Sequence, residues 1–341
     1  MFFFRRLRLV AIILAPILLG LSLGCGSDSA DRIAFVSSIG GDEEVVLLDP
    51  DSREITVLTE NGGQDFSPRW SPNGEVIAYI SDDGGDNEVR LVDLREEIVI
   101  TRLTNARGDD QSLDWSPDGR RLAFISERDG NPELYLMNAD GTNQIRLTST
   151  SAQERLGDWS PDGIWLVFSR SGADSEDGIW LRNPDGVNLI QLTQGQDSDP
   201  TWSPDGQHVA FVRTEGGNSD IYIASRLTGS TWQDPTELTR LTQHQSEDLA
   251  PAWSRESQIL AFVSYRDGNA EIYTTWKDGS NQRRLTSNEA DDLDPVWSPG
   301  GGRIAFVSHL YGPGEIFVMN ADGRNQLRLT NNNVEDRSPD W

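Results

Sequence analysis

The sequence predicts an all-β protein, a seven-bladed β-propeller with four-stranded antiparallel blades. The first observation behind this prediction is a set of tryptophans that recur at intervals of 43 to 51 residues: Trp70, Trp115, Trp159, Trp202, Trp253, Trp297 and Trp341. The second is the fixed order of short β-branched, aromatic and leucine-rich runs between them, and the third is the turn chemistry that separates these runs. A period of about 40 to 45 residues that holds four short strands is typical of a propeller blade.

The unit that begins at Trp115 shows the order of elements within one repeat. Ser-Pro-Asp-Gly at 116–119 predicts a tight turn, because proline presets the second turn position and glycine accepts a positive φ. The Asp-Gly pair at 140–141 predicts another. We name the strands a to d: strand a ends at the tryptophan, and the strands that follow in this unit are b (122–126), c (133–137) and d (145–148).

Strand b is predicted seven times, and the Leu-Thr pair that closes strand d also occurs seven times. The b strands begin at Ile33, Ile77, Leu122, Leu166, Val209, Leu260 and Ile304. The chain thus enters the repeat at strand b and stops at Trp341, the end of strand a. We expect this C-terminal strand to pair with the N-terminal strands b to d and close the ring, which removes open sheet edges. The propeller then spans residues 32–341, with about 44 residues in each blade.

The tryptophans divide into two groups. The seven at the repeat position are expected to pack between blades, where each hides roughly 150 to 250 Å² of surface. The other four are Trp165, Trp180, Trp232 and Trp276, and they are candidates for surface contacts.

The N-terminal segment predicts export. Three arginines precede an apolar run over 9–23, which is typical of a secretory signal and short for a membrane span. The segment 21–25 resembles a bacterial lipobox with Cys25 as the site of lipid attachment. This interpretation divides the N-terminus into a signal peptide (1–24) and a tether (25–31), and it places the protein in the cell envelope, anchored to the membrane through its N-terminal lipid on the periplasmic or extracellular face. An ordinary cleaved signal or an uncleaved anchor is the alternative.

The net charge and the cysteine content limit the possible partners and the sources of stability. A net charge of −26 repels nucleic acid and anionic lipid headgroups, so no nucleic-acid partner is expected. Cys25 is the single cysteine, so no intramolecular disulfide forms and stability rests on blade packing. We expect a monomer.

A carboxylate stands five residues before every repeat tryptophan, in the connection from strand d to strand a. The set is Asp65, Asp110, Glu154, Asp197, Asp248, Asp292 and Asp336. One interpretation is a ring at the channel mouth that binds a partner or a cation, with Ca²⁺ or Mg²⁺ favoured over Zn²⁺ by the oxygen ligands. The alternative, which a repeat-wide residue favours, is that each carboxylate caps its own loop through backbone N–H groups. The three histidines show no metal-ligand spacing, and no other cofactor is expected.

Strand direction predicts which face recognises a partner. The d-to-a and b-to-c connections share one face with the carboxylates, and the variable loops 171–178 and 309–314 lie there. An insertion over 227–236, which holds Trp232, lies between strands c and d on the opposite face.

The repeated Pro-x-Trp-Ser-Pro-Asp-Gly, Ile-Ala-Phe, Ile-Tyr and Asp-Gly…Leu-Thr pattern resembles the WD40-like propeller repeat of the TolB family, over residues 32–341. The same repeat occurs in the propellers of prolyl-oligopeptidase-type peptidases. The resemblance implies an envelope protein of the Tol-Pal type, although TolB proteins carry an α/β domain ahead of six blades and the repeats here number seven.

These observations predict a non-catalytic envelope lipoprotein, not an enzyme, whose propeller is a binding scaffold for a protein or envelope component. No catalytic residue is assigned, because the single Gly-x-Ser-x-Gly match at 20–24 lies inside the signal segment. Two alternatives stay open. One is a Tol-Pal-like transport accessory protein, and the other is a metal-dependent propeller enzyme that acts on polysaccharide, for which several axial histidines would be expected.

Overall fold

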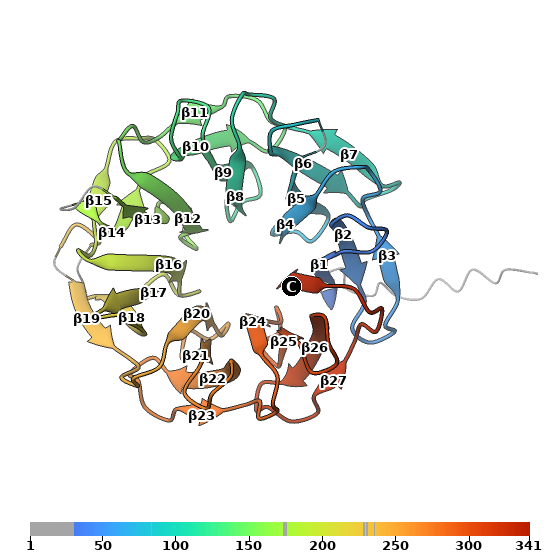
Figure 1. The fold of residues 1–341 in the computed structure, drawn as a ribbon. Coiled ribbons are helices and arrows are strands. Elements are labelled where there is room, and N and C mark those ends of the chain that lie inside the picture. Colours follow the sequence, from blue (N-terminus) through green and yellow to red (C-terminus); the bar gives the residue numbers. More distant parts are fainter. Residues whose placement is uncertain (1–30, 83, 173–175, 228, 230, 235) are drawn as a thin grey trace, which may run out of the picture.

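The computed structural model describes residues 31–82, 84–172, 176–227, 229, 231–234 and 236–341. In these residues 28 strands form seven four-stranded antiparallel sheets, which surround a central axis as the blades of a propeller (Figure 1). The prediction of a seven-bladed all-β ring is confirmed. The predicted signal peptide and Cys25 lie outside the described residues. No helix in the described part of the chain has the length and apolar character needed to cross a membrane.

We number the blades in chain order. The strands of blades 1 to 4, from a to d, are β28 (Asp336–Asp340), β1 (Ile33–Ser37), β2 (Glu44–Leu48), β3 (Ile55–Val57); β4 (Asp65–Trp70), β5 (Val76–Ser81), β6 (Glu88–Asp93), β7 (Val99–Arg102); β8 (Asp110–Trp115), β9 (Arg121–Ser126), β10 (Glu133–Asn138), β11 (Ile145–Arg146); β12 (Gln153–Trp159), β13 (Leu166–Ser171), β14 (Gly178–Arg182), β15 (Leu189–Gln191). Those of blades 5 to 7 are β16 (Gln196–Trp202), β17 (His208–Glu215), β18 (Asn218–Arg226), β19 (Thr236–Arg240); β20 (Asp248–Trp253), β21 (Ile259–Ser264), β22 (Glu271–Trp276), β23 (Arg283–Arg284); β24 (Asp292–Trp297), β25 (Arg303–Ser308), β26 (Glu315–Asn320), β27 (Leu327–Arg328).

The ring closes by strand exchange between the two ends of the described chain, as the sequence predicts. β28 pairs antiparallel with β1, with Ala34 opposite Asp340 and Ser37 opposite Asp336. Blade 1 therefore takes its innermost strand from the C-terminus and its outer three from the N-terminal side (Figure 1). This pairing supplies β1 with a partner on the side toward the axis.

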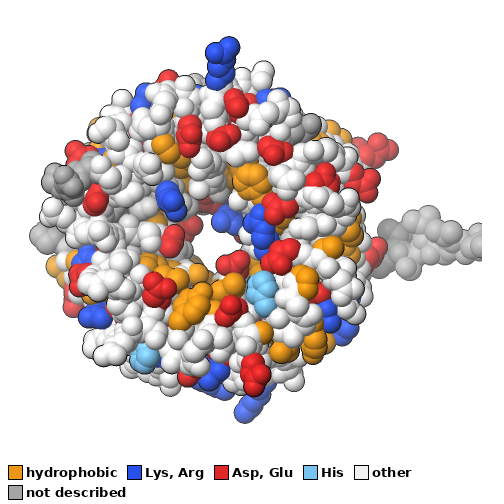
Figure 2. Space-filling view, viewed as in Figure 1, with side chains coloured by type: hydrophobic (Ala, Val, Ile, Leu, Met, Phe, Trp, Pro, Cys, Tyr) orange, Lys and Arg blue, Asp and Glu red, His pale blue; other side chains and the backbone are white. Residues whose placement is uncertain are grey.

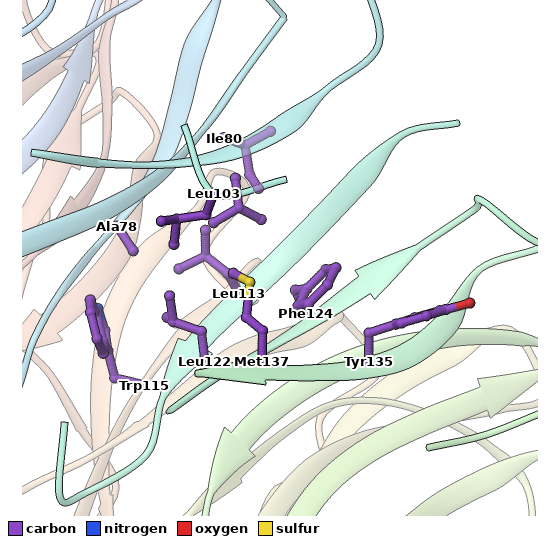
Figure 3. Close-up of a cluster of buried hydrophobic side chains, with 10 residues drawn as sticks. Ala78, Ile80, Leu103, Leu113, Trp115, Leu122, Phe124, Tyr135 and Met137 are labelled. Atoms are coloured by element: carbon purple, nitrogen blue, oxygen red, sulfur yellow. The ribbon is translucent and has the colours of Figure 1, made fainter. Parts of the chain in front are cut away.

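The core lies between neighbouring blades. Strands b and c are rich in β-branched and aromatic residues and bury both faces, as β1 and β2 do along their whole length. Strand d lies at the rim, and all four residues of β7 are exposed. One interblade cluster joins Ala78, Ile80, Val89 and Leu103 of blade 2 to Leu113, Trp115, Leu122, Phe124, Tyr135 and Met137 of blade 3 (Figure 3). Since apolar burial contributes about 25 cal/mol per Å², blade stacking stabilises the ring more than any single sheet does.

Strand a carries a β-bulge in every blade, between the carboxylate and the tryptophan. In six blades the residue three positions before the tryptophan has φ between 42° and 53°: Ser67, Ser112, Asp199, Ala250, Asp294 and Ser338. In blade 4 the bulge contains Gly157, two positions before the tryptophan. An added Cβ at this glycine would stand 2.3 Å from the carbonyl oxygen of Pro200. A bulge bends its strand and re-aims the side chains beside it.

The surface role predicted for the four remaining tryptophans is wrong for two of them. Trp165 is 8% exposed and Trp232 is 4% exposed, and both belong to the core between blades 4 and 5. Trp180 is half-buried under the guanidinium of Arg170, whose carbon lies 4.3 Å from the ring centroid. Trp276 alone of the four is exposed. The insertion thus supplies an indole to the core because it folds back over the gap between two blades.

Candidate functional site

The seven predicted carboxylates lie at the first or second residue of strand a, and all are buried, at 0 to 5% exposure. They do not share one set of partners. In blades 3 to 6 an arginine contacts the carboxylate, at 2.6 to 3.2 Å between nitrogen and oxygen: Arg128 to Asp110, Arg170 to Glu154, Arg213 to Asp197 and Arg266 to Asp248. In blades 7, 1 and 2 an asparagine four residues earlier donates its amide N–H, at 2.6 to 2.9 Å: Asn288 to Asp292, Asn332 to Asp336 and Asn61 to Asp65.

The two kinds of partner give the carboxylates different electrostatics. Burial raises the pKa of Asp65, Asp292 and Asp336, since a neutral amide offsets little of the cost of a buried charge. Burial also raises the pKa of Glu154, although the guanidinium of Arg170 opposes that shift. The ring of carboxylates is therefore compensated by cations on one side of the propeller and by amides on the other.

The threonine of each Leu-Thr pair connects these carboxylates to the sheet. Its hydroxyl oxygen accepts a hydrogen bond, 2.8 or 2.9 Å long, from a backbone N–H in the first half of strand c of the same blade. The seven threonines are Thr59, Thr104, Thr148, Thr193, Thr242, Thr286 and Thr330. Two of them, Thr148 and Thr193, donate their proton across the blade boundary to Glu154 and Asp197. The carboxylates thus tie strand d of one blade to strand a of the next.

These contacts occupy most of the carboxylate oxygens with protein groups, whereas Oδ1 of Asp65 and Oδ1 of Asp292 are buried and accept no hydrogen bond from the described residues. Across the residues that the structure describes, no three His, Cys, Asp or Glu side chains come together in a group that could hold a metal ion. Cation or partner binding by the seven carboxylates stays a prediction, which a calcium titration tests.

The axis of the propeller holds a cavity of about 600 Å³, lined by strand a of several blades. Figure 2 shows it as an opening rimmed by acidic, basic, hydrophobic and histidine side chains. The position immediately before the repeat tryptophan contributes a lining residue in every blade: Arg69, Asp114, Asp158, Thr201, Ala252, Val296 and Asp340. The bulge in strand a explains this, because it turns the residues just before the tryptophan toward the axis.

One wall of the cavity is acidic. Asp340, Asp114 and Asp158 come from blades 1, 3 and 4, and Arg69 of blade 2 lies between the first two, with its Nη1 3.5 Å from Oδ1 of Asp340. The opposite wall is mainly apolar, with Pro251, Ala252, Pro295 and Val296 from blades 6 and 7, and Asp294 of blade 7 adds one carboxyl there.

Each acidic-wall aspartate also links two blades. Asp340 accepts the backbone N–H of Trp70 at 2.7 Å, Asp114 that of Trp159 at 2.8 Å, and Asp158 that of Trp202 at 3.0 Å. Three tryptophans whose preceding blade has another residue at this position donate their indole N–H to its carbonyl oxygen instead: Trp115 to Arg69, Trp253 to Thr201 and Trp297 to Ala252. Trp341 donates to the carboxylate of Asp31. One position therefore sets both the charge of the channel and the way the tryptophan is held.

The carboxyls of the acidic wall have raised pKa values. Burial, together with the neighbouring charge of Asp158, raises the pKa of Asp114 to about 8, although the N–H of Trp159 and the guanidinium of Arg69 oppose the shift. Burial likewise raises the pKa of Asp158 and Asp340. A carboxyl that stays partly protonated at pH 7 can donate as well as accept a hydrogen bond.

The three histidines lie apart. His208 stacks on Trp253 with its ring centroid 5.9 Å away, the Nε2 of His309 lies 3.9 Å from Glu335, and the carbonyl oxygen of His244 accepts a bond from Asn218. Sequence reasoning missed the position before the tryptophan, although aspartate at three of its seven occurrences was the available signal.

A family model described as the TolB beta propeller domain matches residues 25–200 and 185–339. A Tol-Pal system protein TolB from Desulfosudis oleivorans is 38% identical over 65 residues, a match that spans 19% of this chain and 13% of that relative. The crystal structure of TolB from Acinetobacter baumannii has a TM-score of 0.58 at 22% identity, over 92% of this chain and 67% of that one.

An oligogalacturonate lyase in complex with manganese has a TM-score of 0.69 at 18% identity, over 87% of each chain. At these identities the solved structures share the fold alone. The family model, in contrast, follows the repeat along nearly the whole propeller, so the chain belongs to the TolB β-propeller domain family.

Proposed function

We propose that the propeller is a non-catalytic binding scaffold of the cell envelope, which holds a segment of a partner protein in its axial cavity. The observation that carries this proposal is the uneven lining of that cavity, with three carboxyls and Arg69 on one wall and mainly proline, alanine and valine, with Asp294, on the other. A cavity of about 600 Å³ has the size of a typical ligand site and accepts several side chains of an extended segment.

The lining favours a segment with basic and apolar side chains on opposite sides. Basic groups would meet Asp114, Asp158 and Asp340, and their charge would favour the ionised form of these carboxyls. Apolar groups would contact Ala252 and Val296 without leaving a polar atom unpaired. The strongly negative net charge of the chain would also steer a basic segment toward the opening.

The envelope location is supported by two observations. The N-terminal segment has the composition of an export signal, and the relatives matched in sequence are Tol-Pal system proteins. We propose a lipid anchor at Cys25 and a place in a Tol-Pal-type assembly.

The test is a crosslinking pull-down from native envelopes with three forms of the full chain. Ala252→Arg places a bulky cation on the apolar wall and is expected to abolish capture of the partner. Val187→Arg changes an exposed rim residue of blade 4 and is the matched control, which should capture the same partner as the native chain. Circular dichroism is used to check that both variants fold. Equal capture by the native chain and Ala252→Arg would exclude the axial cavity as the binding site, and a partner released in chemically altered form would contradict a non-catalytic role.

A further inference from the structure

A residue at the start of strand b in each blade, either its first residue or the one just before it, lies beside the repeat tryptophan of the next blade and covers it. In three grooves the cover is an arginine, whose guanidinium carbon lies 5.0 to 5.7 Å from the indole centroid: Arg32 at Trp70, Arg121 at Trp159 and Arg303 at Trp341. His208 covers Trp253, and Trp165, Ile259 and Val76 pack in the clusters of Trp202, Trp297 and Trp115. Valine is the smallest of these seven covers.

The groove between blades 4 and 5 shows how an indole fits at this place. Trp232, from the insertion of blade 5, contacts Trp202 edge to face, with ring centroids 5.0 Å apart and an interplanar angle of 88°. Trp165 belongs to the same cluster. Gln233, the residue after Trp232, has its Nε2 3.5 Å from Oδ1 of Asn188 in blade 4. The chain thus fills this groove with a loop that carries a tryptophan.

The groove between blades 2 and 3 has the same walls but no such filling. Strand pairing places Val76, Thr101 and Ala139 where blades 4 and 5 have Trp165, Ile190 and Arg226. A cavity of about 670 Å³ remains over Trp115. Where Ile259 is the cover, the corresponding groove between blades 6 and 7 holds a smaller cavity of about 260 Å³. The groove covered by Val76 therefore holds more space than the groove covered by Ile259.

The floor of the open groove is apolar and its rim is acidic. Val76, Leu91, Leu103 and Ala139 surround Trp115, which lies in the cluster that Figure 3 shows. The rim carries Glu75, Asp93, Asp118 and Asp140. Among the described residues that line this cavity the one cation is Arg95, which is paired with Asp93. Hydrogen bonds from Arg95 hold the pKa of Asp93 at about 2, and hydrogen bonds within their turns lower the pKa of Asp118 and Asp140. These carboxylates are ionised at neutral pH.

The rim of blade 2 extends the apolar floor outward. Val99 pairs with Asp93 in the sheet and Thr101 pairs with Leu91, so Val99 projects on the face of β7 that lines the groove. It is 53% exposed. Val99 occupies the position in blade 2 that Asn188 has in blade 4, and Asn188 contacts Gln233 in the filled groove. A segment bound over Trp115 would therefore continue over Val99.

We propose that the groove between blades 2 and 3 binds a tryptophan side chain of a partner protein, presented between basic residues, as Trp232 fills the groove between blades 4 and 5. This surface lies on the side of the a-to-b and c-to-d turns, apart from the apolar wall of the axial cavity, so it is independent of the proposed function. The indole of the partner would cover the apolar floor of the groove, and the basic residues beside it would face the four rim carboxylates.

The test uses the synthetic peptide acetyl-Lys-Trp-Lys-amide as the probe, titrated into the full propeller and followed by two-dimensional NMR of the backbone amides. The amides of Asp118, Gly119 and Asp140 are expected to shift. Acetyl-Lys-Ala-Lys-amide reports the basic charge alone and acetyl-Glu-Trp-Glu-amide reports the indole alone. Each is expected to bind at least about tenfold more weakly, which corresponds to about 1.4 kcal/mol. Equal affinity for all three peptides, or shifts confined to other surfaces, would overturn the proposal.

Two variants sharpen the test. Val76→Arg copies the arginine cover that lies over Trp159 and adds a positive charge beside the basic peptide, so it is expected to abolish the shifts. Ile259→Arg makes the same change in the groove between blades 6 and 7 and should leave the shifts unchanged. If Val76→Arg does not fold, the peptide series on the native chain still decides the matter. Native affinity in folded Val76→Arg would contradict the proposal.

Discussion

The grooves above Trp115 and Trp202 occupy the same place in the repeat, and the chain treats them in opposite ways. The two indoles are equally buried, at 6% and 5% exposure. Yet Trp202 is enclosed by Trp165 and Trp232, whereas Trp115 has Val76 beside it and a cavity of about 670 Å³ outside. The repeat thus fixes where a groove lies, and one cover residue and one loop decide whether it becomes core or binding surface.

The largest expected effect is the loss of the enclosed indole. Trp202→Ala should lower the free energy of unfolding by about 4 kcal/mol, because it leaves a cavity among close-packed aromatic rings. Trp115→Ala should cost about 1 kcal/mol less, since water already reaches the groove beside it. Urea unfolding of both variants measures the difference. A larger loss of unfolding free energy in Trp115→Ala than in Trp202→Ala would contradict the difference described for the two grooves.

The insertion loop is expected to contribute to stability through one side chain. Trp232→Ala should cost about 2 to 3 kcal/mol, because the indole is 4% exposed and its removal uncovers Trp202. The matched control is Trp276→Ala, at 50% exposure, which should change stability by no more than about 0.5 kcal/mol. Thermal and urea unfolding compare the two, and equal costs would show that the loop does not close the groove.

The acidic wall of the axis provides a contrast with the acidic rim of the groove, where the carboxylates are ionised. Folded Asp114 has a pKa raised to about 8 and an ordinary value of 3.8 when unfolded, so between pH 4 and 8 the folded state holds a proton that the unfolded state has released. The unfolding free energy contributed by this group therefore falls as pH rises through that window.

Asp114→Asn keeps the oxygen that accepts the Trp159 N–H but removes the titration. Relative to the native chain it should gain stability between pH 5 and 8, on the order of 1 kcal/mol because the side chain faces the open channel. Asp118→Asn, on the groove rim, should show no gain toward high pH, since its folded pKa lies below the ordinary value. Urea midpoints across this pH range measure both, and parallel pH profiles for Asp114→Asn and the native chain would refute the raised pKa.

A smaller effect is expected from a third groove. Arg121→Val removes the guanidinium that lies 5.0 Å from the Trp159 ring centroid and reproduces the cover of the open groove. The loss of this cation–π contact should cost about 0.5 to 1 kcal/mol. The variant should also bind the Lys-Trp-Lys peptide at a second site, which NMR titration would detect. An unchanged number of sites would mean that the cover does not control access.

The smallest expected effect concerns calcium. The carboxylates at the start of strand a already contact arginine, asparagine and threonine, so added Ca²⁺ should leave the melting temperature unchanged. A calcium-dependent rise in melting temperature would instead support the cation ring. Asp65→Asn, in the half of the ring with amide partners, then identifies whether that half is responsible.

Much of the fold could be predicted from the sequence, because the tryptophan period, the b strands and the Leu-Thr pairs are local signals that repeat. Ring closure followed from the phase of the two ends, and β28 pairs with β1 as expected. The carboxylates were found by their spacing from the tryptophan. Their partners were not, since Arg170 and Asn61 reach them from different strands and loops and no periodicity marks such contacts.

The burial of Trp232 and the open groove over Trp115 depend on contacts between blades. Trp232 lies in an insertion without periodic neighbours, so its sequence surroundings resemble those of a surface loop. The cover position becomes visible only when strands of adjacent blades are placed side by side, because Val76 and Trp115 are 39 residues apart. The acidic wall could not be predicted from the sequence for the same reason, because Asp340 and Trp70 come together only when the ring closes.

The most direct test of this difference between the two grooves is a crystal structure of the propeller soaked with indole, solved for the native chain and for Trp232→Ala. We expect indole over Trp115 in both crystals and a second molecule over Trp202 in the variant alone. Indole absent from the groove beside Val76, or bound over Trp202 while Trp232 is in place, would contradict it.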